Sequence, residues 1–152
     1  MTVLLGSSAV SWSDDFQKGL DAAKKEDYAT ALKEWTPLAE QGLAEAQFNL
    51  GLTYRLGRGV SQDYHTAVKW YLLSAEQGTY RAQNNLGLMY TKGDGVSQDY
   101  IRAHMWFNLA AAGGNKNGTE SRDRVATNMT AEQIGKAQKM ARECQARNYK
   151  DC

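Results

Sequence analysis

An internal repeat of 36 residues constrains the fold of this chain more than any other feature of its sequence. Segment 46–81 begins AQFNLGLTYRLGRGVSQDY, and segment 82–117 begins AQNNLGLMYTKGDGVSQDY. Aligned with a shift of 36 residues, the two segments are identical at 19 positions. A repeat of this length is typical of helix-pair arrays, in which each unit buries its apolar face by stacking on its neighbours. We therefore expect a stacked array of similar units.

The identities within each repeat fall on two amphipathic helices. In the first helix, alanine, leucine and tyrosine recur at helical spacing on one face. In the second helix, two adjacent aromatic residues are followed by small residues one turn later. We predict that both stripes face the core. The first stripe is Ala46, Leu50 and Tyr54, copied as Ala82, Leu86 and Tyr90, and the second is Ala67, Trp70, Tyr71, Ser74 and Ala75, copied as Ala103, Trp106, Phe107, Ala110 and Ala111.

Glycine and aspartate mark the turn between the two helices of each repeat. Gly57 and Gly93 lie where the first helix should end, and glycine readily adopts the left-handed conformation that closes a helix. Asp63 and Asp99 precede the second helix, where a carboxylate can accept hydrogen bonds from the free N–H groups. This arrangement predicts the same turn in both repeats.

Two further glycines lie inside the predicted first helices. Gly51 and its copy Gly87 each cost a helix about 1 kcal/mol relative to alanine. We expect close helix packing to offset this cost, with the missing side chain leaving room for the Trp70 and Trp106 stripe or its neighbours.

The repeat pattern continues more weakly on both sides of the two strong copies. Upstream, Asp27, Tyr28, Ala31 and the run 39–42 precede matching residues by the same 36 positions. Downstream, the leucine–glycine core is lost, and residues 130–133 form a capping box that opens a last helix. We predict repeats over 14–42, 43–78 and 79–114, followed by capping helices over 115–152. Helices are expected near 14–25, 28–41, 43–56, 63–77, 79–92, 99–112, 117–128 and 130–147.

The segment 1–13 has a different composition from the repeats. Its residues are mostly apolar or small, without lysine or arginine, and the run is too short to span a bilayer. Val3 to Leu5 lead into small residues, and Ser11-Trp12-Ser13 offers a small-x-small cleavage pattern. The segment is interpreted either as the remnant of a secretory signal or as an ordinary frayed terminus.

The repeated string A-x-x-x-L-G-x-x-Y-x-x-G-x-G-V-x-x-D-Y-x-x-A-x-x-W-x-x-x-A resembles the Sel-one-like repeat, a relative of the tetratricopeptide repeat. The resemblance is strong over 46–114, and residues 14–42 are similar to a more tetratricopeptide-like variant, with Glu34 where the other repeats have tryptophan. It implies an all-α, right-handed superhelix that acts as an adaptor or scaffold for a partner protein or peptide. An exported enzyme or enzyme-inhibitor module, as among cysteine-rich relatives, and a structural component of the envelope are the alternatives.

Neither the charge nor the motifs of the chain favour catalysis, metal binding, nucleic-acid binding or membrane binding. With 18 basic and 17 acidic residues the net charge is +1, so no global field recruits nucleic acid or an anionic membrane. The aromatic residues lie on the core stripes without interleaved basic residues, which argues against base stacking. His65 and His104 occupy different repeat positions and have no metal-ligand spacing. We expect a monomer without catalysis, cofactor, metal, nucleic-acid binding or membrane insertion.

The concave face of such a superhelix is lined by the first helices of successive repeats. If the stripe of Ala46, Leu50 and Tyr54 points into the layer, the opposite side forms the groove. Its composition, apolar centres with basic and amide groups at the edges, suits a bound peptide or helix, although the apolar members could instead pack against neighbouring repeats. The predicted partner-binding residues are Phe48, Leu52, Arg55, Asn84, Leu88, Lys92, Glu120 and Arg124.

The two cysteines, Cys144 and Cys152, allow one intramolecular pairing. Eight residues of continuous helix would separate their Cα atoms by about 12 Å, whereas a disulfide needs less than about 7 Å, so the helix must end between them. Asn148 is a suitable left-handed residue for that end. We predict this disulfide and a periplasmic or secreted location; the alternative is two reduced thiols in the cytoplasm. Cysteine-rich relatives join the two helices of a repeat instead.

Overall fold

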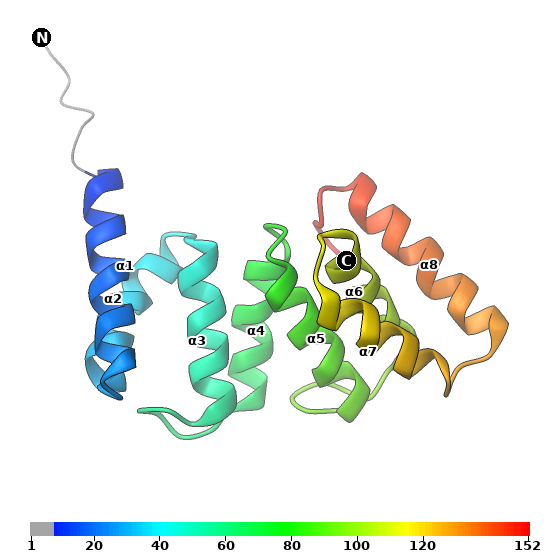
Figure 1. Cartoon of the computed structure of the whole chain (residues 1–152), viewed down its shortest axis with the longest axis horizontal. Coiled ribbons are helices and arrows are strands. Elements are labelled where there is room, and N and C mark those ends of the chain that lie inside the picture. Colours follow the sequence, from blue (N-terminus) through cyan, green and yellow to red (C-terminus); the bar gives the residue numbers. More distant parts are fainter. Residues whose placement is uncertain (1–7) are drawn as a thin grey trace, which may run out of the picture.

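The computed structural model describes residues 8–152, and this part of the chain consists of helices and turns without strands (Figure 1). The helices stack side by side from one end of the molecule to the other. The predicted all-α solenoid of helix pairs is confirmed. The helices are α1 (Ser8–Lys24), α2 (Tyr28–Glu40), α3 (Ala44–Leu56), α4 (Tyr64–Ala75), α5 (Tyr80–Lys92), α6 (Tyr100–Ala112), α7 (Lys116–Ala126) and α8 (Ala131–Ala146).

The first helix differs most from its predicted boundaries, because α1 begins at Ser8 and not near residue 14. Trp12 ties this extra turn to the repeat array. Its indole N–H donates to the Gln41 side chain at 3.1 Å, and its ring packs on a cluster that includes Trp35 and Leu38. Part of the segment 1–13 is therefore helical, whereas residues 1–7 lie outside the described residues, and the interpretation as a signal remnant stays a prediction.

The predicted turns form as the sequence indicates. Gly57 and Gly93 end α3 and α5 in the left-handed conformation, with φ of 65° and 76°. Asp63 and Asp99 cap α4 and α6, each accepting a hydrogen bond from the backbone N–H three residues later. The carboxylate–N–H contacts fix where the second helix of each repeat begins.

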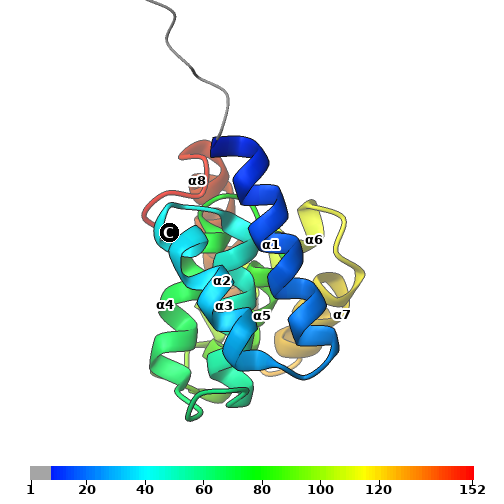
Figure 2. The ribbon, with the colours of Figure 1, turned by 90° about the vertical axis from the view of Figure 1, so that its left-hand side faces the viewer.

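Successive repeats are joined at equivalent positions by buried glutamines. Gln47 of α3 donates to the carbonyl oxygen of Ala39 at 3.0 Å, and Gln83 of α5 donates to that of Ala75 at 3.2 Å. Each bond ties a first helix to the last turn of the helix before it, so that α2 packs on α3 and α4 on α5. Viewed from the end of α1, the later helix pairs follow one behind another (Figure 2).

The helix glycines permit the closest packing within each repeat. A Cβ atom at Gly51 would lie 2.5 Å from the Tyr71 ring, and one at Gly87 would overlap the Phe107 ring. The expected close packing is confirmed, and the rings that use the space are Tyr71 and Phe107, the neighbours of the two tryptophans.

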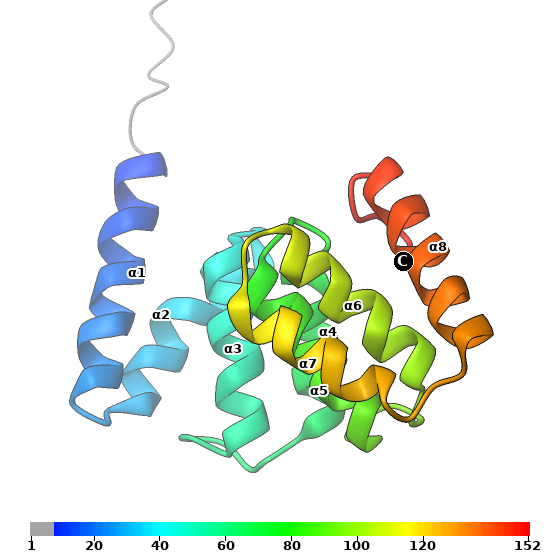
Figure 3. The ribbon, with the colours of Figure 1, turned by 45° about the vertical axis from the view of Figure 1, so that its right-hand side comes forward.

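The two C-terminal helices both pack on α6. Helix α7 takes the place of a further first helix and contacts α5 and α6, while α8 packs against α6 on a different side (Figure 3). Gly118 allows the close approach of α7, because a Cβ there would lie 2.8 Å from that of Ala110. The capping helices thus cover α6 individually rather than packing mainly on each other.

Candidate functional site

Two adjoining pockets lie between the helices that open successive repeats. One lies between α3 and α5, and the other between α5 and α7. They share Leu88 and Lys92 on α5, so together they form one surface, which we call the groove. Other hollows, such as the one between α1 and the start of α3, share no lining residue with the groove.

The α3/α5 pocket is small, and hydrogen bonds hold two of the polar side chains that line it. The Tyr71 hydroxyl accepts a hydrogen bond from Arg55 Nε at 3.3 Å and is also hydrogen-bonded to Asn85. Arg55 and Asn85 line the pocket, whose volume is only about 30 Å³. Burial raises the pKa of Tyr71, although the Arg55 guanidinium opposes this shift. The hydroxyl therefore stays protonated and anchors the two groove residues above it.

The α5/α7 pocket is larger and has an apolar floor. Its volume is about 210 Å³, and its floor is formed by Leu88, Phe107 and Val125. Phe107 and Val125 are almost fully buried and belong to one apolar cluster. Because Phe107 has no hydroxyl, nothing equivalent to the Arg55–Tyr71 hydrogen bond closes this pocket. Its rim is Thr91, Lys92, Ser121, Arg124 and Asn128.

The structure brings four of the eight predicted partner-binding residues together. Arg55, Leu88, Lys92 and Arg124 line the groove, and each is at least partly exposed. Leu52 is half-buried and Glu120 is exposed, but both lie outside the two pockets. Contact of any of these residues with a partner stays a prediction.

The prediction that Phe48 and Asn84 lie on the open side of their helices is wrong, because both are buried. Phe48 is 7% exposed and packs on Tyr71, with 5.8 Å between ring centroids, while the Arg81 guanidinium lies 4.5 Å from its centroid. Asn84 is 9% exposed, and its buried side-chain oxygen has no hydrogen-bond partner among the described residues. Both side chains belong to the interior of the stack.

The error has a physical reason. A first helix inside a stack has two buried faces, because it packs both on the preceding second helix and on the second helix of its own repeat. Leu50 faces α2 in one apolar cluster, whereas Phe48 faces α4 in another. The groove is the narrow strip that remains, so the side opposite the Ala46–Leu50 stripe is largely interior.

Sequence reasoning assigned Tyr71 and Phe107 to the core stripe and missed their relation to the groove: Phe107 lines the α5/α7 pocket, and the buried Tyr71 hydroxyl is hydrogen-bonded to two residues that line the α3/α5 pocket. A signal was present. Each ring crosses its first helix at a glycine, and the 36-residue shift pairs Tyr71 and Arg55 with Phe107 and Thr91. Loss of the hydroxyl together with loss of the arginine that donates to it indicates that these positions are in contact.

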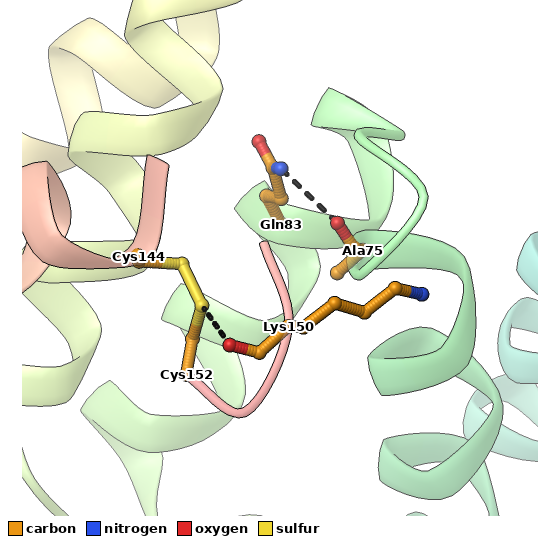
Figure 4. The surroundings of a disulfide bond; sticks show 5 residues. All are labelled: Ala75, Gln83, Cys144, Lys150 and Cys152. Carbon is orange, nitrogen blue, oxygen red and sulfur yellow. Dashed lines mark hydrogen bonds between the residues drawn. A yellow bond between two sulfur atoms is a disulfide. The ribbon is translucent and has the colours of Figure 1, made fainter. Parts of the chain in front are cut away.

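The second predicted feature is at the C-terminus, where residues 144–152 form a loop closed by a disulfide, which we call the hook. The structure joins Cys144 and Cys152 in a disulfide, with 5.4 Å between their Cα atoms, beside Ala75 and Gln83 (Figure 4). Helix α8 ends at Ala146, and Asn148 then adopts a positive φ of 52°, as a left-handed end requires. Both cysteines pack on the large apolar cluster beneath α8. The hook fixes the end of α8 against the array.

Within the described residues, three other kinds of feature could form a site: a metal centre, a membrane span and the buried His104. No group of three or more histidine, cysteine or acidic residues within 8–152 is placed to hold a metal ion. None of the described helices is long and apolar enough to cross a membrane. Burial and the Arg122 guanidinium lower the pKa of His104, although Asp123 opposes this shift. His104 is 3% exposed, and its Nδ1 has no hydrogen-bond partner within the described part of the chain.

Comparison with known proteins identifies relatives. The family model of the Sel1 repeat matches residues 44–79 and 81–115. The crystal structure of a Sel1 repeat protein from Oxalobacter formigenes is 32% identical over 74% of this chain and 88% of that one, with a TM-score of 0.68. The crystal structure of c5321, a protective antigen present in uropathogenic Escherichia coli strains displaying an SLR fold, is 29% identical over 91% of this chain, with a TM-score of 0.84. This chain spans 31% of the antigen's length. No curated protein matches the chain significantly.

Proposed function

This chain belongs to the Sel1 repeat family, and we propose that it is a non-catalytic scaffold that holds a segment of a partner protein in the groove. The observation that carries the proposal is the pair of adjoining pockets along α3, α5 and α7. An extended peptide buries side chains in such hollows and presents its backbone to polar groups at the rim.

The groove differs from other exposed parts of the array because it places an apolar side chain beside hollows. Leu88 is a half-buried leucine beside two pockets, whereas Leu73 of α4 is 45% exposed and lines neither. An apolar side chain beside a hollow can bury further surface when a partner binds, which contributes about 25 cal/mol per Å². Leu73 offers a matched control of the same residue type.

The test compares Leu88→Arg with Leu73→Arg. Full-length wild type and the two variants serve as baits for proteins of the native extract, and captured proteins are then purified and titrated against each bait. We expect Leu73→Arg to retain the partner and Leu88→Arg to lose at least tenfold in affinity. Equal binding by wild type and Leu88→Arg, or loss only with Leu73→Arg, would contradict a groove site.

We further propose that the protein works as a monomer in an oxidising compartment, the periplasm or the outside of the cell. The disulfide between Cys144 and Cys152 supports the proposed compartment, because disulfides persist mainly in oxidising surroundings. Intact-mass analysis of native protein, alkylated without reductant, should find no reactive thiol. Two alkylated cysteines would contradict the proposed location.

A further inference from the structure

The α5/α7 pocket has the size of a site for one side chain. Its volume of about 210 Å³ lies below the range of about 300–1,000 Å³ that is typical of small-molecule sites. The floor of Leu88, Phe107 and Val125 is apolar and held in place, since Phe107 is packed against Gly87. A rigid apolar hollow of this size fits a leucine or phenylalanine side chain.

Two cations stand at the rim of this pocket without anionic partners. Lys92 and Arg124 are exposed and form no ion pair with any described residue, whereas Arg81, Arg102 and Arg122 each pair with a carboxylate. Opposite charges attract over a distance of several ångströms even at an exposed site. The rim therefore favours a partner that carries a carboxylate next to its apolar side chain.

Polar groups for the partner's backbone are also present. The Ser121 and Asn128 side chains line the pocket and make no hydrogen bond within the described part of the chain. The Thr91 hydroxyl, in contrast, donates to the Gly87 carbonyl oxygen at 2.8 Å and is already used. Ser121 and Asn128 can donate to and accept from a peptide backbone that crosses the pocket.

We infer that the α5/α7 pocket binds one leucine- or phenylalanine-sized side chain of a partner segment in which aspartate or glutamate lies next to that residue. The inference rests on the proposed function and gives the partner its chemistry. The α3/α5 pocket cannot hold a second such anchor, because its volume is only about 30 Å³ and hydrogen bonds to Tyr71 hold Arg55 and Asn85 in its wall. The partner's apolar residue is thus placed at the third repeat.

The test is selection from a random library of displayed 12-residue peptides against the full chain. Three baits are used: wild type, Phe107→Tyr, which places a hydroxyl on the pocket floor, and Lys92→Gln with Arg124→Gln, which removes the rim charge. Circular dichroism verifies that each bait is folded. Enriched peptides are synthesised, and their affinities are measured by fluorescence anisotropy at low and high salt.

We expect wild type to enrich peptides with an apolar residue beside aspartate or glutamate. Loss of the two cations should weaken these peptides about tenfold and remove their salt dependence. Phe107→Tyr should weaken peptides with a large apolar anchor and spare those in which alanine replaces it.

Other results overturn the inference in distinguishable ways. Enriched peptides of different chemistry that still lose affinity with Leu88→Arg would overturn the acidic-apolar partner and leave the groove proposal standing. Absence of enrichment, or peptides that bind every variant equally, would overturn both the inference and the proposed groove.

Discussion

The second and third repeats share more than half of their residues but present different surfaces. In the second repeat, the Tyr71 hydroxyl accepts from Arg55 and leaves a pocket of about 30 Å³. In the third, Phe107 has no hydroxyl, Thr91 replaces the arginine, and the pocket measures about 210 Å³. The outer faces differ too, because α8 covers α6 but not α4. Equivalent repeats thus diverge at the positions that the stacking does not fix.

This difference teaches how a repeat protein acquires specificity. The stacking residues are constrained in each unit, since every repeat must bury the same faces against its neighbours. The walls of the two pockets differ at several such positions, where Arg55, Asn85 and Met89 are replaced by the smaller Thr91, Ser121 and Val125, while the stack is kept. Four measurements test how far this contrast between the two repeats extends.

The largest expected effect concerns the two tryptophans. Trp106 is 1% exposed and shares a cluster with Ala141 and Cys144 of α8, whereas Trp70 is only half-buried. Trp106→Ala should lower the free energy of unfolding by about 3–5 kcal/mol and Trp70→Ala by about 1–2 kcal/mol. The sequence predicts equal burial of the two, so equal losses in urea denaturation would break the contrast.

The next effect concerns the hook that holds α8 on the third repeat. Replacing Cys144 and Cys152 by serine should cost roughly 2–3 kcal/mol on the chain-entropy estimate for a short loop. Hydrogen exchange should accelerate in α8 and α6 more than in α4, which α8 does not cover. Reductant should reproduce the effect in wild type, and uniform acceleration through all helices would contradict a local role.

A smaller effect is expected from exchanging the aromatic residues at the equivalent positions 71 and 107. Tyr71→Phe removes the acceptor of the Arg55 hydrogen bond and should cost about 0.5–1.5 kcal/mol of stability. Phe107→Tyr should change stability less, because its hydroxyl would point toward an open pocket. Chemical denaturation measures the free energy of unfolding of both variants. If Tyr71→Phe leaves this free energy unchanged, the hydroxyl does not hold Arg55.

The smallest effect is the pH dependence that His104 contributes in the third repeat. The folded-state pKa of His104 lies below its ordinary value of 6.5, chiefly because the ring is buried. The unfolded chain therefore binds more protons there, so stability is fully present above pH 6.5 and is lost as pH falls through the folded pKa. Val68 occupies the equivalent position, and His104→Val should flatten the fall between pH 7 and 5. If the free energy of unfolding of His104→Val falls as steeply with pH as that of wild type, other groups cause the fall.

Local sequence predicted most of the helices and their ends. Asp63 and Gly57 act through contacts with residues a few positions away, so their motifs are sufficient to place a helix start and a helix end. The same holds for the capping box at Thr130 and for the left-handed Asn148. The extension of α1 could not be found this way, because Trp12 is held by Gln41, 29 residues away.

The candidate site was predicted only in part. Arg55, Leu88, Lys92 and Arg124 were correctly placed at the groove, because the first helices line the concave face of any such array. Phe48 and Asn84 were misplaced because their burial depends on α4 and α6, which pack on the same helices from a second side.

The sequence by itself determined the 36-residue period, the helices, the turns and the family of this protein, because these follow from contacts within one repeat or between adjacent turns. Only the tertiary structure decided which face of α5 is open, that Tyr71 holds two wall residues of the small pocket while Phe107 lines the larger one, and that α8 packs on α6. These features depend on the distance and angle between neighbouring helices, which are set by side chains from several repeats at once.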